Sequence, residues 1–174
     1  MMVNIKIQTN LIELCYKYNI KKFIFIGSSC IYPKSSKIPI KETELLKGEL
    51  EPTNQWYALT KIHGIKTCEA FNLQYGLNFS CVMPANLFGP NDKYDERSHV
   101  IPALIKRMHD AKMNNQSSVK VWGDGTPKRE FLYVEDCAKI ICKILFNYKY
   151  FKLINIGTGK DITIKKLAQI LKKV

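Results

Sequence analysis

The strongest constraint on the fold of this chain is a short apolar run that ends in a glycine and two serines. The run covers residues 23–26 and leads into Gly27, Ser28 and Ser29. A continuous apolar segment of this length, bounded by a glycine, predicts a buried strand of a parallel sheet. Ser28, just past the strand, is able to hydrogen-bond a hydroxyl or carbonyl group of a substrate. The junction therefore predicts an α/β fold with chemistry next to the strand end.

A tyrosine and a lysine four positions apart, Tyr57 and Lys61, are the second informative feature. The spacing alone is weak evidence, because it occurs three times, as Tyr18/Lys22, Tyr57/Lys61 and Tyr148/Lys152. The first copy lies at an expected helix-to-strand junction, and the last in an expected helix end and connector. Only the middle copy falls inside a long periodic helix, where positions i and i+4 share a face. We therefore expect the Lys61 ammonium to lie beside the Tyr57 phenol and to lower its pKa from about 10.

Read alone, the pair is more simply a half-buried tyrosine and a solvated lysine. The nearby Ser28 favours the catalytic interpretation, since a hydroxyl at a strand end is not explained by a surface pair. Together the three residues suit proton and hydride transfer at a sugar-like carbon.

Helices and strands are expected to alternate along the chain, which by itself predicts an α/β fold. The longest irregular stretch, residues 30–52, is rich in Pro and Lys and is expected to cover a site. Expected helices cover residues 4–18, 53–75, 100–111 and 135–146, with an amphipathic surface helix at 165–173. Expected strands cover residues 23–26, 79–83, 119–122, 130–134 and 153–156. The inner face of the helix at 53–75 is expected to use Leu59, Ile62, Ile65, Ala70 and Phe71.

Composition agrees with a cytoplasmic globular protein that binds neither membranes nor nucleic acid. The 174 residues are 46% hydrophobic, enough for a core and one domain by length, with no apolar stretch near 18 residues and no signal peptide. Six cysteines without a C-x-x-C pair and three histidines without ligand spacing predict reduced thiols and no metal. The net charge of +12 comes from scattered lysines without an Arg-rich run, so a nucleic-acid function is not expected. The positive field is suited to an anionic sugar nucleotide.

Several segments resemble one family of enzymes. They are residues 27–34 with Ser-Ser-Cys-Ile-Tyr-Pro, 50–54, 83–90, 98–104 with Ser-His-Val-Ile-Pro, and 122–131, together with Tyr57 and Lys61. The chain is similar to GDP-L-fucose synthases, extended short-chain dehydrogenases/reductases that epimerise and then reduce GDP-4-keto-6-deoxymannose. The Tyr-x-x-x-Lys motif is shared by many sugar-nucleotide epimerases and dehydratases, whereas the two quoted segments are much more particular to this family.

The resemblance implies a fold, a division of the chain and a cofactor. The fold is part of a Rossmann-type, doubly wound parallel sheet with a small α/β substrate-binding lobe. Residues 1–90 correspond to the C-terminal part of the dinucleotide-binding domain, and residues 91–174 to the substrate lobe and sheet-completing elements. The cofactor is NADP, the substrate is a GDP-sugar, and the family forms homodimers through helices that match residues 4–18 and 53–75.

The resemblance also implies a role for individual residues. Tyr57 is the general acid of the reduction, Lys61 lowers its pKa and holds the nicotinamide ribose, and Ser28 positions the carbonyl. Epimerisation uses a base and an acid, which correspond to Cys30 and His99. The dinucleotide is lined by Ile26, Gly27, Ser28, Ser29, Lys61, Pro84, Ala85, Asn86, Leu87 and His99. The GDP-sugar is held by Arg107, Trp122 and Arg129.

Without the resemblance, simpler interpretations of four of these residues remain open. Cys30 is equally a small apolar residue, and His99 a loop or helix-cap histidine. Arg107 is equally an exposed helix charge, and Trp122 a core residue.

One feature of dinucleotide-binding folds is not found in the sequence. No glycine-rich turn precedes Gly27, and Gly157-Thr158-Gly159 lacks a third glycine in register and is better interpreted as a turn. Relative to the family the chain looks truncated at both ends, so we expect weak NADPH binding and an open apolar edge at residues 23–26 that promotes self-association. Two alternatives therefore stay open: another NAD(P)-dependent nucleotide-sugar epimerase or dehydratase, or a non-catalytic remnant that binds a partner.

Overall fold

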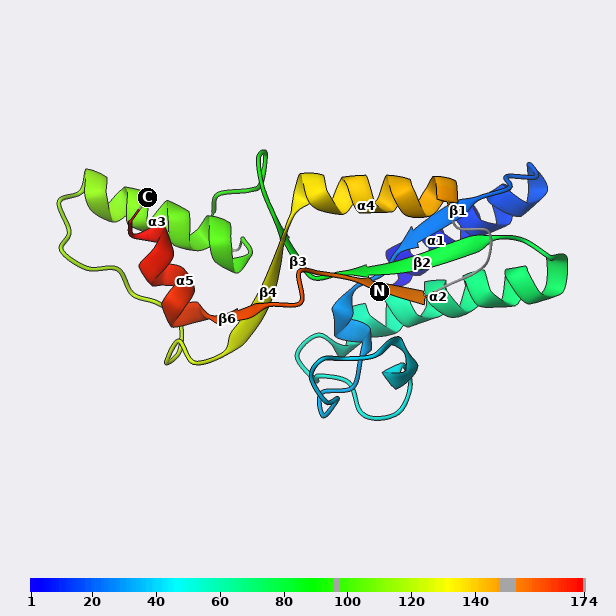
Figure 1. The fold of residues 1–174 in the computed structure, drawn as a ribbon, viewed down its shortest axis with the longest axis horizontal. Coiled ribbons are helices and arrows are strands. Elements are labelled where there is room, and N and C mark those ends of the chain that lie inside the picture. The colour runs from blue at the N-terminus through cyan, green and yellow to red at the C-terminus, as the bar shows by residue number, and fades with distance from the viewer. Residues whose placement is uncertain (96–97, 148–152, 174) are drawn as a thin grey trace. The chain divides into compact units, whose positions relative to one another are not determined.

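The computed structural model describes residues 1–95, 98–147 and 153–173, and Figure 1 shows their fold. The chain forms two compact units, each built from two segments. The first unit contains Met1–Ala85 and Asp136–Ile156, and the second contains Asn86–Glu135 and Gly157–Val174. A division of function after residue 90 stays a prediction.

The first unit is built around a parallel sheet with the strand order β1-β2-β5. Its register pairs Ile26 of β1 with Val82 of β2, and Val82 with Ile154 of β5. All six residues of the central strand β2 are buried, as expected for a strand covered on both faces. Figure 1 shows helices α2 and α4 on opposite sides of this sheet. The elements of the unit are α1 (Met2–Lys17), β1 (Phe23–Ile26), α2 (Gln55–Tyr75), β2 (Phe79–Pro84), α4 (Val134–Asn147, which begins in the second unit) and β5 (Leu153–Ile156).

The predicted α/β fold with a parallel sheet is therefore confirmed, and the predicted edge is found as well. Among the described residues, β1 pairs with β2 alone, and Ile26, at the end of β1, is 49% exposed. An edge strand presents unpaired N–H and C=O groups, which makes it a place where another chain can add.

The core of the first unit lies between the sheet, α1 and α2. Ile12, Phe25, Ile65, Phe79 and Met83 are buried together there. The prediction for the inner face of α2 was partly wrong: Ile62 and Ile65 are buried and Phe71 packs on the core, but Leu59 and Ala70 are exposed.

The irregular segment between β1 and α2 contains only two short 3-10 turns, η1 (Ser29–Ile31) and η2 (Glu42–Glu44). Its first residues are nevertheless well packed, since Ile31 and Tyr32 are buried in the same core. The segment is thus anchored at its beginning, directly after the strand that carries Ser28.

The second unit combines a small mixed sheet with two helices. β3 pairs parallel with β4, and β4 pairs antiparallel with β6. The amphipathic face of the last helix is buried through Leu167 and Ala168, which pack against Ile101 and Leu104. The elements of the unit are β3 (Asn86–Phe88), α3 (Val100–Met113), β4 (Lys128–Tyr133), β6 (Asp161–Thr163) and α5 (Ile164–Leu171).

Residues 119–122 are not a strand, and the strands β3 and β6, each three residues long, were not predicted because so short a segment carries no measurable periodicity. The turn interpretation of residues 157–159 is confirmed: Gly159 has a φ of +73°, and its N–H donates to Glu130 Oε1 at 2.6 Å. The pair Tyr148/Lys152 lies outside the described residues. None of the helices in the described ranges is long and apolar enough to cross a membrane.

Candidate functional site

The site begins where β1 ends. Ser28 precedes the 3-10 turn η1 as its N-cap, and its hydroxyl accepts a hydrogen bond from the backbone N–H of Cys30 at 3.5 Å. Gly27 is buried and joins the turn to the sheet, because its N–H donates to the carbonyl of Val82 at 2.8 Å. A β-carbon at Gly27 would lie 3.2 Å from that same carbonyl oxygen, so little room exists for a side chain. Ser28 and Cys30 are in this way fixed at the carboxyl end of the strand.

Tyr57 comes to the same place from the first turn of α2. Burial raises the pKa of Tyr57 above its ordinary value, the nearby Cys30 raises it further, and the side chain of Ser28 opposes the change. The predicted direction of this shift was wrong, because Lys61 does not act on Tyr57 strongly enough to outweigh burial. Tyr57 is consequently a protonated hydrogen-bond donor at neutral pH.

Lys61 lies one turn further along α2 and points back toward β1. Its ammonium donates a hydrogen bond to the carbonyl of Ile26 at 2.8 Å and lies 5.2 Å from the ring centroid of Phe25 and 5.6 Å from that of Tyr57. Burial lowers the pKa of Lys61, and Cys30 acts in the opposite direction. The lysine therefore connects helix α2 to the end of β1.

Cys30 completes the group. Its side chain is partly buried, and burial raises the pKa of its thiol, while Ser28, the backbone of the turn and the charge of Lys61 oppose the increase. The structure thus brings together Ser28, Cys30, Tyr57 and Lys61, four of the five residues predicted to be catalytic.

The fifth, His99, belongs to the second unit. It is the exposed N-cap residue of α3, and its backbone carbonyl, not its ring, takes part in the cap by accepting from the N–H of Ala103 at 3.0 Å. The helix-cap position agrees with the simpler interpretation of this histidine, and its pairing with Cys30 stays a prediction.

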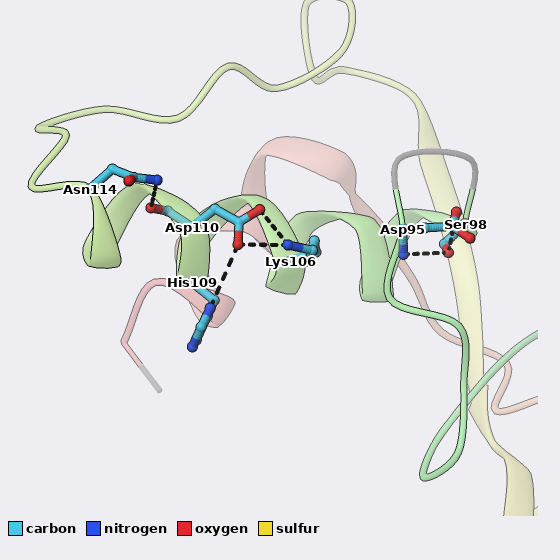
Figure 2. A network of polar contacts seen from close by, with 6 residues as sticks. All are labelled: Asp95, Ser98, Lys106, His109, Asp110 and Asn114. Atoms are coloured by element: carbon cyan, nitrogen blue, oxygen red, sulfur yellow. Dashed lines mark hydrogen bonds and ion pairs between the residues drawn. The ribbon is translucent and has the colours of Figure 1, made fainter.

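Figure 2 shows how the segment before His99 and the surface of α3 are organised. Asp95 and Ser98, which lie ahead of the histidine, bond each other: the N–H of Asp95 donates to Ser98 Oγ, and Ser98 Oγ donates to Asp95 Oδ1, both at 3.0 Å. Further along, Lys106 and Asp110 form an i,i+4 pair at 2.7 Å, which lowers the pKa of Asp110. Such an exposed pair supports the helix modestly.

The residues predicted to line the dinucleotide divide between the two units. Seven of them belong to the first unit and lie at or next to the carboxyl ends of β1 and β2: Ile26, Gly27, Ser28, Ser29, Lys61, Pro84 and Ala85. Open α/β sheets bind their ligands at this edge. Ala85 extends the ladder by donating its N–H to the carbonyl of Ile156 at 2.8 Å. In the second unit, Asn86 donates from Nδ2 to the carbonyl of Glu130 at 2.9 Å, and Leu87 pairs with Leu132.

The predicted substrate residues all lie in the second unit. The guanidinium of Arg107 stacks on the ring of Trp122, with Cζ 3.6 Å from the ring centroid, and donates to the carbonyl of Lys120 at 3.1 Å. These two residues border a cavity of about 410 Å³ that also contacts Asp110, Asn114 and Gln116. Trp122 is 42% exposed, so the core interpretation of this residue was wrong. Arg129, on β4, is exposed and donates to the carbonyl of Lys128 at 2.8 Å.

Sequence reasoning missed residues that support the site without touching a ligand. The ring of Phe25 lies beside the ammonium of Lys61. Asn155, on β5, is hydrogen-bonded to the side chains of Tyr32 and Glu42. Nothing in the periodicity distinguishes such residues, since their contacts cross long stretches of sequence. Within the ranges that the structure covers, no group of three or more His, Cys, Asp or Glu side chains is arranged to hold a metal ion.

Comparison with known proteins identifies the family. Residues 1–157 match the model of the NAD dependent epimerase/dehydratase family. The chain belongs to this family. It is 50% identical to GDP-L-fucose synthase 1 of Arabidopsis thaliana over 173 residues, which are 99% of this chain and 54% of the relative. It is 47% identical to the GDP-L-fucose synthase of Escherichia coli, over 98% of this chain and 56% of the relative.

Solved structures of family members share the fold of this chain. A GDP-L-fucose synthetase from Naegleria fowleri bound to NADP matches 98% of this chain and 55% of its own, with a TM-score of 0.87 and 30% identity. A GDP-D-glycero-L-gluco-heptose synthase from Campylobacter jejuni, solved in the presence of NADPH, matches 98% and 61% with a TM-score of 0.87 and 31% identity. The Rossmann-type fold is thereby confirmed. The chain spans about half the length of the curated relatives that it matches.

Proposed function

We propose that the chain carries the catalytic residues for 3,5-epimerisation and 4-reduction of GDP-4-keto-6-deoxy-D-mannose to GDP-L-fucose, with NADP as the cofactor. The observation that carries the proposal is the gathering of Ser28, Cys30, Tyr57 and Lys61 at the carboxyl end of β1. An enzyme that only reduces needs the first, third and fourth of these groups. A thiol beside them adds a base, which epimerisation requires.

In the proposed reduction, Tyr57 gives its proton to the C4 oxygen of the substrate. Because burial keeps this phenol protonated, it is ready to donate when negative charge develops on that oxygen. Ser28, whose side chain already acts on the pKa of Tyr57, orients the carbonyl, and the ammonium of Lys61 stabilises the phenolate that is left. The nicotinamide, when bound, supplies the hydride.

In the proposed epimerisation, the Cys30 thiolate removes the proton at C3 and at C5, the carbons next to the C4 ketone. A thiol whose pKa is raised is less often ionised, but its thiolate is the stronger base. His99 is proposed as the acid that returns a proton on the opposite face of the sugar.

Cofactor and substrate are assigned to the predicted residues by their chemistry. The half-buried ammonium of Lys61, now bonded to the carbonyl of Ile26, fits the hydroxyls of a nicotinamide ribose, with Ser28 and Ser29 close by along the chain. Arg107 and Arg129 suit a pyrophosphate, and the ring of Trp122 suits a guanine base. We further propose a cytoplasmic location, from the biosynthetic roles in the relatives' names.

A homodimer is part of the proposal. Val3, Ile7, Leu11 and Leu14 recur every three or four residues along α1 and are all exposed, so they form an apolar stripe on one side of the helix. The stripe lies beside the face through which Gln8 and Ile12 are buried against α2. A second copy of the same surface is the simplest occupant of such a stripe, since most soluble oligomers are symmetric dimers.

The test uses a hybrid protein in which a glycine-rich strand–turn–helix segment of a dinucleotide-binding fold precedes Met1. It is incubated with NADPH and GDP-4-keto-6-deoxymannose in heavy water. We expect loss of NADPH absorbance and, by mass spectrometry, deuterium at C3 and C5 of the product. The 174-residue chain alone is the control. NADPH consumption without deuterium at either carbon would replace the proposal by a simple ketoreductase.

A further inference from the structure

One asparagine on β5 joins three parts of the segment that follows the catalytic strand. The Oδ1 of Asn155 accepts a hydrogen bond from the hydroxyl of Tyr32 at 2.5 Å. Its Nδ2 donates to the carbonyl of Ile40 at 3.0 Å, and its backbone N–H donates to Glu42 Oε1 at 2.9 Å. Each partner is more than one hundred residues away in sequence. We call this set of three hydrogen bonds the Asn155 clamp.

The clamp provides a hydrogen-bond acceptor for the outer side of β5. In the described sheet β5 is an edge strand, so the N–H groups on its outer side have no strand to bond. The carboxylate of Glu42 takes the place of a neighbouring strand at Asn155. The bond is charge-assisted, which makes it stronger than a bond between neutral groups. It therefore fixes the middle of the irregular segment to the edge of the sheet.

The same clamp reaches the catalytic thiol through Tyr32. This tyrosine is 4% exposed and comes directly after the turn η1, two positions from Cys30. The turn itself is held by few bonds: the contact from Cys30 N–H to Ser28 Oγ is 3.5 Å, and the N–H groups of Ile31 and Tyr32 bond backbone carbonyls at 3.3 and 3.4 Å. The 2.5 Å bond of Tyr32 is much shorter than any of these.

Tyr32 remains a donor over the whole physiological range. Its pKa lies above the ordinary value because the phenol is buried and the carboxylate of Glu42 is near, although the bond to Asn155 acts in the opposite direction. Asn155 Oδ1 can only accept. The bond therefore has a single polarity and does not alternate between two arrangements.

We propose that Asn155 is a positioning residue, which holds the Cys30 thiol beside Ser28 and Tyr57 by fixing Tyr32 at the end of the turn. The inference rests on the proposed function in one respect, the use of Cys30 as a base. Without the clamp the turn keeps only the packing of Ile31 and its three long hydrogen bonds, so we expect it to shift relative to the sheet, which exposes the thiol and separates it from Ser28 and Tyr57.

The test measures the reactivity of Cys30 in the 174-residue chain itself and needs no turnover. Asn155→Leu is compared with Asn72→Leu. Asn72 is a matched control, because it is another partly buried asparagine of the first unit that makes two hydrogen bonds. Asn72 Nδ2 donates to the carbonyl of Phe79 at 2.7 Å, and the N–H of Phe79 donates to Asn72 Oδ1 at 2.8 Å. Alkylation by iodoacetamide is followed from pH 6 to 10 by peptide mass mapping, with the exposed Cys142 as the internal reference thiol.

Burial is the main cause of the raised pKa of Cys30, so release of the turn should lower that pKa and increase access to the thiol. In Asn155→Leu we expect Cys30 to react about three to ten times faster near pH 8, with its pH profile shifted to lower pH, since one pKa unit changes the thiolate fraction about tenfold. Asn72→Leu should melt earlier than the parent but keep the parent's Cys30 profile.

A milder variant keeps the test informative if Asn155→Leu does not fold. Tyr32→Phe removes only the hydroxyl that donates a hydrogen bond to Asn155. Tyr18→Phe, at an exposed tyrosine, is its control. Tyr32→Phe should shift the Cys30 profile in the same direction by a smaller factor. Unchanged profiles in Asn155→Leu and Tyr32→Phe, or an equal shift in Asn72→Leu, would overturn the inference. A shifted Cys30 profile in Asn155→Leu would support the clamp even if the hybrid protein incorporated no deuterium into the product. The missing deuterium would then reject the proposed function alone.

Discussion

The aromatic ring of Phe25 fills the space that a β-carbon on Gly64 would occupy. All three of the closest atoms to such a carbon belong to that ring. The same ring carries the ammonium of Lys61, 5.2 Å from its centroid, and Phe25 lies on the strand whose end carries Ser28. The missing side chain at Gly64 thus lets the catalytic helix approach the strand closely enough for Lys61 to reach the carbonyl of Ile26.

Gly64→Ala is expected to destabilise the first unit although alanine is the better helix former. The gain in helix propensity is about 1 kcal/mol, whereas inserting a methyl group into a packed core costs about 1 to 3 kcal/mol, so the net loss is up to about 2 kcal/mol. Urea unfolding should show a net loss, and the double variant Phe25→Leu/Gly64→Ala should be more stable than the sum of the two single changes predicts. Additive effects would contradict a contact between the two side chains.

Local sequence patterns encode the helices and strands of this chain better than they encode which residues become buried. The strand at residues 23–26 and the helix that holds Tyr57 and Lys61 were predicted correctly, because each depends on the periodicity of neighbouring residues. The inner face of α2 was predicted less well. Leu59 and Ala70 continue the apolar pattern but are exposed, since burial depends on where α1 ends up against α2.

Spacing and family resemblance point to the residues proposed as catalytic, but they do not predict the electrostatics of those residues. The pKa of Tyr57 is raised because the phenol is partly buried, and burial is a property of tertiary packing that the Tyr57/Lys61 spacing does not contain. Asn155 and Glu42 were missed for a related reason: they act on the site from positions more than one hundred residues apart. The sequence therefore predicts which groups meet better than it predicts what holds them.

Replacing two catalytic residues should separate the two halves of the proposed reaction in the hybrid protein. Removing a positioned acid or base typically lowers a rate by about 10² to 10⁴. Tyr57→Phe removes the proton donor for the reduction, so NADPH consumption should fall by about that factor while deuterium still enters at C3 and C5. Mass spectrometry in heavy water, run beside NADPH absorbance, reads both steps.

Cys30→Ser should have the opposite effect, because a hydroxyl is a far weaker base than a thiolate. Deuterium exchange should stop, while direct reduction of the unepimerised ketone continues. His99→Gln should resemble Cys30→Ser more than Tyr57→Phe. Exchange at the parent rate in Cys30→Ser would exclude this cysteine as the base.

The free energy of unfolding is expected to decrease at alkaline pH because of Tyr32. Burial and Glu42 raise the pKa of Tyr32 in the folded chain, whereas an unfolded tyrosine ionises near pH 10. The stabilisation is therefore complete below about pH 10 and is lost as the pH rises above it, at up to about 1.4 kcal/mol per pH unit. Urea unfolding at several pH values should give a flatter alkaline dependence in Tyr32→Phe than in the parent. Tyr18→Phe, at an exposed position, should keep the parent slope, and equal slopes in all three proteins would contradict the assignment.

A charge placed in the apolar stripe of α1 is expected to shift the chain from dimer to monomer. Leu11→Lys is the sharpest change, because Leu11 is exposed between Ile7 and Leu14 in the middle of the stripe. Burying an unpaired ammonium in a symmetric interface costs several kcal/mol, and the change occurs twice in each dimer. Light scattering after size exclusion should show a loss of dimer at micromolar concentration. Glu13→Lys, an exposed polar position on the same helix, is the control and should leave the dimer intact. A parent protein that is a monomer at high concentration would exclude the dimer.

The cavity beside Arg107 and Trp122 is expected to bind the nucleotide half of the substrate. The guanidinium already stacks on the indole, and the partly exposed ring leaves surface on which a guanine base can stack, with the charge of Arg107 available to phosphate. Titration calorimetry with GDP should show that Trp122→Ala weakens binding by about 5- to 30-fold, corresponding to about 1 to 2 kcal/mol for a stacking contact. Trp122→Phe should retain part of the affinity because it keeps an aromatic face. The chain has one further tryptophan, Trp56, which lies exposed on α2 in the first unit, so Trp56→Ala is the matched control and should bind GDP like the parent. An unchanged affinity in Trp122→Ala would remove this cavity from the proposed substrate site.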